Sequence, residues 1–330
     1  MNHYPVSLDT LLTMAVNDHA SDLHLSAGLS PILRIQGELK KMELPLLTSE
    51  QLQCLLHSIL NEAQHNVLMQ ELELDYAYTL TDVGRFRINI YHQLRGLAVA
   101  IRLIPEKIPT LASLQLPHIF YNFCEYTQGL ILITGPTGAG KTSSLAALIN
   151  HINQNQAKHI ITIEDPIEFI HPQLKSLISQ RELHNNTRSF KNALRAALRE
   201  DPDIILVGEL RDLESIHLAL TAAETGHLVL ATLHTVSAPK TIDRIIDIFP
   251  GNEKDMIRAM LSECLTAVVS QKFFQCPKNS RRAIFEILVC TPAIRNLIRE
   301  NKIPQIYSVM QTGQASGMCT FEQYLTTLKS

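Results

Sequence analysis

The stretch that decides the fold reads LILITGPTGAGKT, from Leu130 to Thr142. It passes from a short apolar run into the pattern G-x-x-x-x-G-K-[ST]. In this pattern the glycines let backbone N–H groups curl around phosphate oxygens, and a helix begins at the end of the loop. The sequence therefore predicts a strand, a phosphate loop and a helix over 142 to about 153.

The fixed positions of the loop suit a nucleoside triphosphate. We expect Lys141 to reach the β- and γ-phosphates of ATP, and the hydroxyl of Thr142 to bind Mg²⁺. The predicted ATP-binding residues of the loop are Gly135, Pro136, Thr137, Gly138, Ala139, Gly140, Lys141, Thr142 and Ser143. A glycine-rich turn that merely starts a helix is the alternative, and the strand–loop–helix context disfavours it.

Short apolar runs recur along the second part of the chain, with helical patterns between them. They cover 130–133, 159–163, 204–207 and 228–231. Continuously apolar strands of this kind are typical of an α/β fold, in which helices cover a parallel sheet on both faces. From about 251 to 330 the pattern predicts helices, apart from a strand at 283–289.

The first part of the chain has the pattern of a separate α/β unit. Helices are expected at 8–16 and 49–70, and short strands at 21–25, 32–35, 76–78, 85–89 and 97–101. Three prolines between 105 and 118 indicate a stiff linker. The predicted domains are therefore 1–104 and 119–330, with the linker 105–118 between them.

Composition narrows the class of function. Lys and Arg number 29 against 32 for Asp and Glu, and Trp is absent, so a broad nucleic-acid surface is not expected. No apolar run reaches the length of a membrane span, and residues 1–20 lack the basic segment of a signal peptide. Six scattered cysteines without a CxxC pair favour reduced thiols in a cytoplasmic protein.

Two predicted strands run directly into acidic residues. Glu164, Asp165 and Glu168 follow one of them, and Gly208 and Glu209 follow the other. Because ligands of open α/β sheets bind beyond the carboxyl ends of the strands, we expect these acids near the γ-phosphate. Glu209 is the candidate that orients or deprotonates the attacking water, with Glu164 or Glu168 near the metal. Acids that cap turns are the alternative.

Two histidines flank the predicted strand 228–233. His234 follows its carboxyl end, where a polar side chain could sense the γ-phosphate, whereas His227 precedes the strand. Seven residues of extended chain span ~23 Å, so the two side chains cannot share one metal ion. A hydrogen-bonded turn histidine is the alternative for each.

Arginines cluster around the predicted strands of the first domain. Arg85 and Arg87 share one face of a strand because side chains alternate, and Arg102 lies on a later strand. Such arginines could reach a phosphate as an arginine finger does. A solvated strand face is the alternative.

Together these motifs resemble the GspE/PilT superfamily of secretion ATPases over nearly the whole chain. Besides the loop, the resemblance is carried by ASDLHLSAG at 20–28, TIEDPIE at 162–168, DIILVGELRD at 203–212, TAAETGH at 221–227, LHT at 233–235 and AIRNL at 293–297. The second to fifth of these are similar to the family's Asp box, atypical Walker B and His box. Gly208 stands where an ordinary Walker B motif has Asp.

The resemblance implies a PAS-like N-terminal domain and a RecA-like P-loop NTPase domain with a helical C-terminal extension at about 251–330. It implies catalytic roles for Glu209, Glu164, Glu168, His234 and His227. It also implies that Arg85, Arg87 and Arg102 match the N-domain arginines that bind the phosphates of ATP. Ala293, Ile294, Arg295, Asn296 and Leu297 match the family motif associated with pilus retraction.

The resemblance further implies a homohexameric ring that uses ATP and Mg²⁺ to power type IV pilus retraction. Such a motor lies at the cytoplasmic face of the inner membrane. Its partners are other copies of the chain, a pilus platform protein in that membrane and a paralogous retraction ATPase, and no nucleic acid is expected.

The sequence disfavours three other functions. Extension motors of the same superfamily usually carry an extra N-terminal region and a tetracysteine zinc site, and this sequence has neither. A nucleic-acid motor on the same core is disfavoured by the balanced charge. A silent nucleotide-binding scaffold is disfavoured because Lys141, Thr142 and Glu209 occur together.

Overall fold

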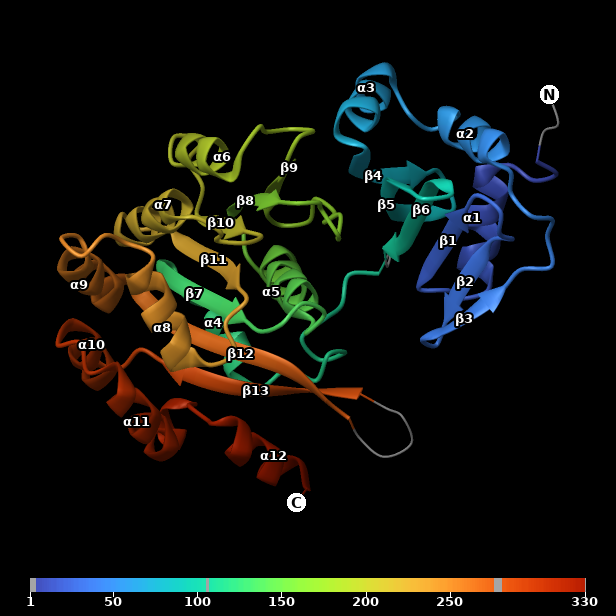
Figure 1. Cartoon of the computed structure of the whole chain (residues 1–330). Helices are drawn as coiled ribbons and strands as arrows, with labels where there is room; N and C mark the ends of the chain where they lie inside the picture. The colour runs from blue at the N-terminus through green and yellow to red at the C-terminus, as the bar shows by residue number, and fades with distance from the viewer. Residues whose placement is uncertain (1–3, 105–106, 276–280, 330) are drawn as a thin grey trace. The chain divides into compact units, whose positions relative to one another are not determined.

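The computed structural model describes residues 4–104, 107–275 and 281–329. The chain divides into two compact units, Met1–Lys107 and Ile108–Ser330, and each contains its own sheet (Figure 1). The division falls within the stretch expected to be a linker. Pro105 and Glu106 of that stretch, and Cys276 among the cysteines, lie outside the described residues.

The first unit is built on an antiparallel sheet of six strands in the order β3-β2-β1-β6-β5-β4. The strands are β1 (Asp22–Ser26), β2 (Ile32–Ile35), β3 (Glu38–Lys41), β4 (Glu73–Leu80), β5 (Gly84–Gln93) and β6 (Gly96–Ile104). Side chains alternate along each strand, so one face of the sheet is apolar, with Leu23, Phe86 and Ile101 in the core. The predicted strands of this unit are confirmed.

Three helices pack on that apolar face: α1 (Leu8–Asn17), α2 (Ser49–His57) and α3 (Glu62–Glu71). The single helix expected at 49–70 is wrong, because the chain forms two helices there. Asn61 caps the second one: its side chain accepts a hydrogen bond from the backbone N–H of Gln64, and the Gln64 side chain accepts one from Asn61. This capping box starts a new helix where a continuous one was expected.

The second unit holds a sheet of seven strands in the order β13-β12-β7-β11-β10-β8-β9. They are β7 (Gly129–Thr134), β8 (His159–Glu164), β9 (Leu177–Glu182), β10 (Ile204–Val207), β11 (Leu228–Leu233), β12 (Leu265–Gln275) and β13 (Arg281–Val289). All neighbouring strands are parallel except β12 and β13. The predicted parallel sheet is confirmed.

Helices cover both faces of this sheet (Figure 1). Along β10, Ile204 and Leu206 face one side, while Ile205 and Val207 face the other. The first side packs against α4 (Ile119–Phe123), α5 (Lys141–Asn155) and α12 (Phe321–Lys329). The second packs against α6 (Phe190–Ala197), α7 (Leu213–Glu224), α8 (Ala238–Asp247), α9 (Lys254–Cys264), α10 (Pro292–Arg299) and α11 (Ile306–Thr312).

Strand β12 corrects the expectation that 251–330 is helical apart from 283–289. Residues Leu265–Gln275 form a long strand that pairs with β7 on one side and with β13 on the other. The run is rich in β-branched and aromatic residues, which favour a pleated, half-buried surface. The helical extension is therefore interrupted by a two-stranded antiparallel hairpin.

The predicted linker also differs from expectation. Within 108–118, the side chains of Leu111 and Leu116 are buried in the same cluster as Phe120 of α4. Because burial of apolar side chains stabilises the folded state, this stretch is part of the second unit and not a free spacer. In the described part of the chain, no helix has the length and apolarity that crossing a membrane requires.

Candidate active site

The phosphate loop connects β7 to α5, as the sequence predicts. Gly138 and Gly140 have φ angles of 77° and 88°, a left-handed conformation that glycine adopts without strain. Helix α5 begins at Lys141, whose side chain is buried and donates hydrogen bonds to the carbonyl oxygens of Gly135 at 2.8 Å and Pro136 at 3.1 Å. The ammonium group therefore lies folded over the loop.

Two carboxylates act electrostatically on Lys141. Burial lowers the pKa of its ammonium group, and the charges of Glu209 and Glu168 act in the opposite direction. A nearby negative charge favours the ionised form of an ammonium group. The structure thus brings the lysine of the loop and two of the predicted acids to one place.

Glu209 follows β10 and is held from two sides. His234 Nε2 lies 3.1 Å from one carboxylate oxygen, and Arg211 Nε donates to the other at 3.0 Å. The guanidinium group of Arg211 also lies 3.6 Å from Asp165, which follows β8. Because β8 and β10 are parallel neighbours, this arginine joins the two acidic strand ends.

Glu164, the last residue of β8, is buried and faces inward. One of its carboxylate oxygens accepts a hydrogen bond from the hydroxyl of Thr162 at 2.6 Å and lies 3.4 Å from Gln180 Nε2. Gln180, on β9, also donates to the carbonyl of Phe169. These contacts fix the carboxylate against the loop that follows β8.

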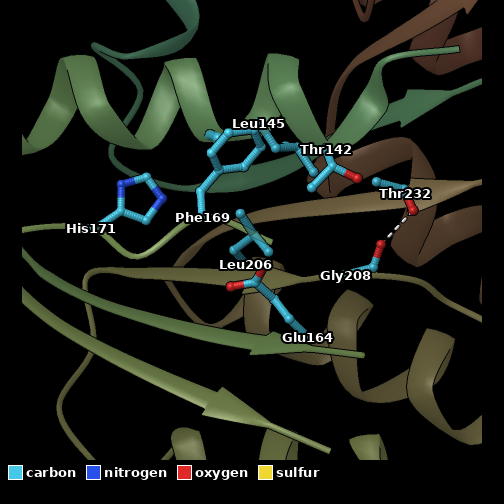
Figure 2. A pocket seen from close by; sticks show the side chains of 9 residues that line it. Thr142, Leu145, Glu164, Phe169, His171, Leu206, Gly208 and Thr232 are labelled. Atoms are coloured by element: carbon cyan, nitrogen blue, oxygen red, sulfur yellow. Dashed lines mark hydrogen bonds between the residues drawn. The ribbon is translucent and has the colours of Figure 1, made fainter. Parts of the chain in front are cut away.

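A small cavity of about 30 Å³ separates the start of α5 from the ends of β8 and β10 (Figure 2). It is lined by Thr142, Leu145, Ala146, Glu164, Phe169, His171, Leu206, Gly208 and Thr232. The hydroxyl of Thr142 and the carboxylate of Glu164 are oxygen donors of the type that Mg²⁺ prefers. A hydrated Mg²⁺ held partly by phosphate oxygens fits this donor set.

No group of three or more His, Cys, Asp or Glu side chains that could hold a metal ion occurs within 4–104, 107–275 and 281–329. Mg²⁺ usually keeps several water ligands and is bound by only one or two protein oxygens together with substrate phosphates. Thr142 and the nearby Glu164 offer the one or two protein oxygens that such a site requires.

Gly208 has a steric reason to be glycine. A Cβ atom at this position would lie 3.2 Å from the carbonyl oxygen of Ile163 and 3.3 Å from Cα of Glu164. The Gly208 amide donates to Ile163 at 2.8 Å, and the hydroxyl of Thr232 donates to the Gly208 carbonyl. An aspartate here would crowd the backbone of β8, which would have to shift by a few tenths of an ångström to admit the ordinary Walker B side chain.

The two histidines lie at opposite ends of the unbroken strand β11. His234 lies beside Glu209, whereas the ring of His227 contacts the carbonyl of Ala222, at the end of α7, at 3.0 Å. Within one subunit the structure therefore brings His234, but not His227, to the phosphate loop.

Two of the three arginines predicted to bind phosphate hold carboxylates of their own sheet. Arg87 binds Asp75 with two nitrogens, the shorter contact being 2.6 Å, and Arg102 Nε donates to Asp22 at 3.0 Å. Arg85 lies two residues before Arg87 on β5, on the same face. These contacts orient the guanidinium groups of Arg87 and Arg102, which are cross-strand partners on β5 and β6.

The pattern that defines the "Type II/IV secretion system protein" family matches residues 4–325. The chain belongs to this family. A twitching motility protein of Neisseria gonorrhoeae is 52% identical over 97% of this chain and 86% of its own length. The type IV pilus retraction ATPase PilT of Pseudomonas aeruginosa is 49% identical over 98% of this chain and 94% of its own.

Solved structures of family members agree with the fold. The crystal structure of the pilus retraction motor PilT with bound ADP matches with a TM-score of 0.92 at 44% identity, covering 98% of this chain and 93% of that one. The Legionella pneumophila ATPase DotB matches with a TM-score of 0.82 at 26% identity, covering 100% and 98%. The chain is thus a P-loop ATPase of this family, with an N-terminal domain and a RecA-like domain that carries C-terminal helices.

In this member of the family, the segment AIRNL lies on α10. Arg295 donates from one guanidinium nitrogen to the carbonyls of Ser262 and Glu263, at the end of α9. Ile294 is buried beneath the helix, while Ala293 and Asn296 are exposed. Because a cation at a helix C-terminus satisfies its last carbonyls, Arg295 anchors the segment and leaves Ala293 and Asn296 accessible.

Two residues near the site were missed by the sequence analysis. Gln271 of β12 contacts the phosphate loop, and the helix that the sequence pattern predicts for its segment gives no sign of this contact. The β-branched and aromatic run 265–275 was the signal that could have revealed it. His171 lines the cavity, and nothing in the sequence near it marks a buried histidine.

We expect His171 to make the protein sensitive to acid. Burial lowers the pKa of its imidazole to about 4, so the native state resists protonation that the unfolded chain accepts near its ordinary value of 6.5. Stability is therefore lost as pH falls from about 6.5 towards 4, by about 3 kcal/mol. His171→Gln should remove this component, as measured by urea unfolding at pH 7 and pH 4.5.

The same change at exposed His65 is the control for this experiment. It should leave the acid-induced loss of stability as large as in the wild type. Equal losses in the wild type and in His171→Gln would contradict the assignment of this sensitivity to His171.

Proposed function

We propose that this chain is the subunit of a homohexameric motor that hydrolyses ATP to retract type IV pili. The observation that carries the proposal is the placement of Glu209, between His234 and Arg211 and close to Lys141, in a chain so similar to PilT along its length. Glu209 is the group that such a site needs to orient the attacking water. The names of the relatives support pilus retraction as the process that ATP hydrolysis drives.

The chemistry divides among a few residues. The amides of the loop and the ammonium group of Lys141 bind the phosphates, since a charged phosphate oxygen is a stronger acceptor than the carbonyls that Lys141 now contacts. Thr142 would help to hold Mg²⁺, which would supply positive charge to neutralise the phosphates. Glu209 orients the attacking water or accepts its proton, and Glu164 and Glu168 act near metal and water.

The two histidines and the three N-domain arginines have roles outside the phosphate loop. His234 senses the γ-phosphate through its contact with Glu209. His227, at the far end of β11, contributes to catalysis from another position in the ring. Arg85, Arg87 and Arg102 bind ATP phosphates after exchanging their present carboxylate partners, as an arginine finger would.

The proposed setting is the cytoplasmic face of the inner membrane. There the ring acts on a pilus platform protein, with the exposed residues of the AIRNL segment available for retraction. A paralogous retraction ATPase is a further partner, and the Pseudomonas aeruginosa pilus ATPase PilU is 36% identical to this chain over 98% of its length. The higher identity to PilT, 49%, favours the role of the principal motor.

Deletion of the gene, followed by imaging of labelled pili, tests the proposed function. Cells without the protein should keep their surface pili, or have more of them, and retraction events should disappear. Loss of pili would instead indicate an extension motor. ATPase activity of the purified protein that rises with DNA or RNA would support a nucleic-acid motor and contradict the proposal.

A further inference from the structure

Strand β12 runs directly beside the phosphate loop. A Cβ atom added to Gly135 would lie 2.1 Å from the carbonyl oxygen of Gln271, and one added to Gly140 would lie 2.9 Å from Gln271 Nε2. Both glycines also have positive φ angles, 145° and 88°. The two ends of the loop are therefore packed against one residue of β12, which leaves no space for side chains there.

The side chain of Gln271 is buried and makes two hydrogen bonds. Its Nε2 donates to the carbonyl oxygen of Ala139 at 2.7 Å, and its Oε1 accepts from the hydroxyl of Ser144 at 2.8 Å. Ala139 belongs to the loop, and Ser144 lies in the first turn of α5. The carboxamide thus joins the loop to the start of the helix from the side of β12.

The contact with Ala139 fixes the direction of one peptide group. A trans peptide is planar, and its C=O and N–H bonds point in opposite directions. Because the Ala139 carbonyl points to Gln271, the N–H of Gly140 in the same peptide points away from β12. Phosphate loops bind anions through backbone N–H groups held in such fixed directions.

We propose that Gln271 is a positioning residue for nucleotide binding, which holds the Ala139–Gly140 peptide so that its N–H faces the phosphates. This inference rests on nucleotide binding at the phosphate loop. Gln271 does not touch the nucleotide, and it acts through the carbonyl of Ala139. A buried amide whose oxygen and nitrogen are both hydrogen-bonded is costly to disturb, because each partner would be left unsatisfied.

Gln271→Glu tests the proposal with little change in shape. The carboxylate still accepts from Ser144, but it cannot donate to Ala139 and it places negative charge behind the loop. We expect the Kd for a fluorescent ADP analogue with Mg²⁺ to rise by about 10- to 100-fold, which corresponds to about 1.4–2.8 kcal/mol. The KM for ATP should rise by more than kcat falls.

Asn153→Asp is the matched control. Asn153 is a buried carboxamide near the other end of α5, and its Nδ2 donates to the carbonyl of Pro172 at 2.7 Å. This variant makes the same change from amide to carboxylate and involves the same helix. Unlike Gln271, however, Asn153 makes no hydrogen bond to the phosphate loop in the described part of the chain. Its Tm should fall while its Kd for the ADP analogue stays within threefold of the wild type.

Gln271→Met serves if the charged variant does not fold, because it removes both hydrogen bonds without adding charge. For either variant, a Kd for the ADP analogue within threefold of the wild type would overturn the proposal. A loss of affinity no greater than that of Asn153→Asp would overturn it as well. Lys141→Ala separates this failure from a broader one. If Lys141→Ala no longer binds the ADP analogue while Gln271→Glu binds it as the wild type does, only the role of Gln271 is contradicted. If both variants keep it, nucleotide binding at the loop fails as well.

Discussion

Glu209→Gln should lower kcat for ATP hydrolysis by at least about 100-fold while nucleotide affinity stays within a few-fold of the wild type. The amide keeps the size of the side chain, but it cannot accept a proton from water. It also loses the charge that holds Glu209 between His234 and Arg211. Steady-state ATPase assays and ADP titrations on the same preparation measure both effects.

Glu214→Gln is the control for this prediction. Glu214 likewise lies between two basic side chains, with Lys191 at 2.5 Å and Arg195 at 3.2 Å, but it belongs to the first turn of α7. Its kcat should be unchanged, because exposed ion pairs of this kind contribute little to stability. Wild-type hydrolysis by Glu209→Gln would show that another group activates the water.

Lys141→Ala should abolish ATP turnover and raise the Kd for nucleotide by at least about 100-fold. The ammonium group is the positive side chain that starts α5, and without it the phosphates would meet Glu209 and Glu168 without the positive charge of the loop. A titration with a fluorescent nucleotide measures the affinity, and release of inorganic phosphate measures the turnover.

Lys158→Ala is the matching control, since Lys158 forms an exposed ion pair with Asp203 at 3.1 Å, ahead of β8. It should bind and hydrolyse ATP as the wild type does. Turnover retained in Lys141→Ala would contradict the role of the phosphate loop itself.

Much of the second unit could be predicted because its signals are local. The glycines of the loop are recognisable from their spacing in the sequence alone. The apolar runs of β7, β8, β10 and β11 are buried on both faces. Runs of this kind remain recognisable without knowledge of the partners. The acids follow the strand ends, and parallel pairing then brings Glu164 and Glu209 to the same edge.

What escaped prediction depends on contacts between distant segments. Gln271 contacts Ala139 and Ser144 across more than 120 residues of chain, and no local spacing encodes such a meeting. The burial of His171 and the fit of Gly208 against Ile163 are of the same kind. In the first unit, the break between α2 and α3 depends on one capping box, which weighs little against a long apolar pattern.

The most direct test of the central claim, that hydrolysis at this site drives pilus retraction, is a count of retraction events in a deletion strain that carries either the wild-type gene or Glu209→Gln. Fluorescently labelled pili are followed in single cells at matched protein levels. The account predicts that both strains have pili and that only the wild-type gene restores retraction. Retraction at the wild-type frequency in cells with Glu209→Gln would contradict it.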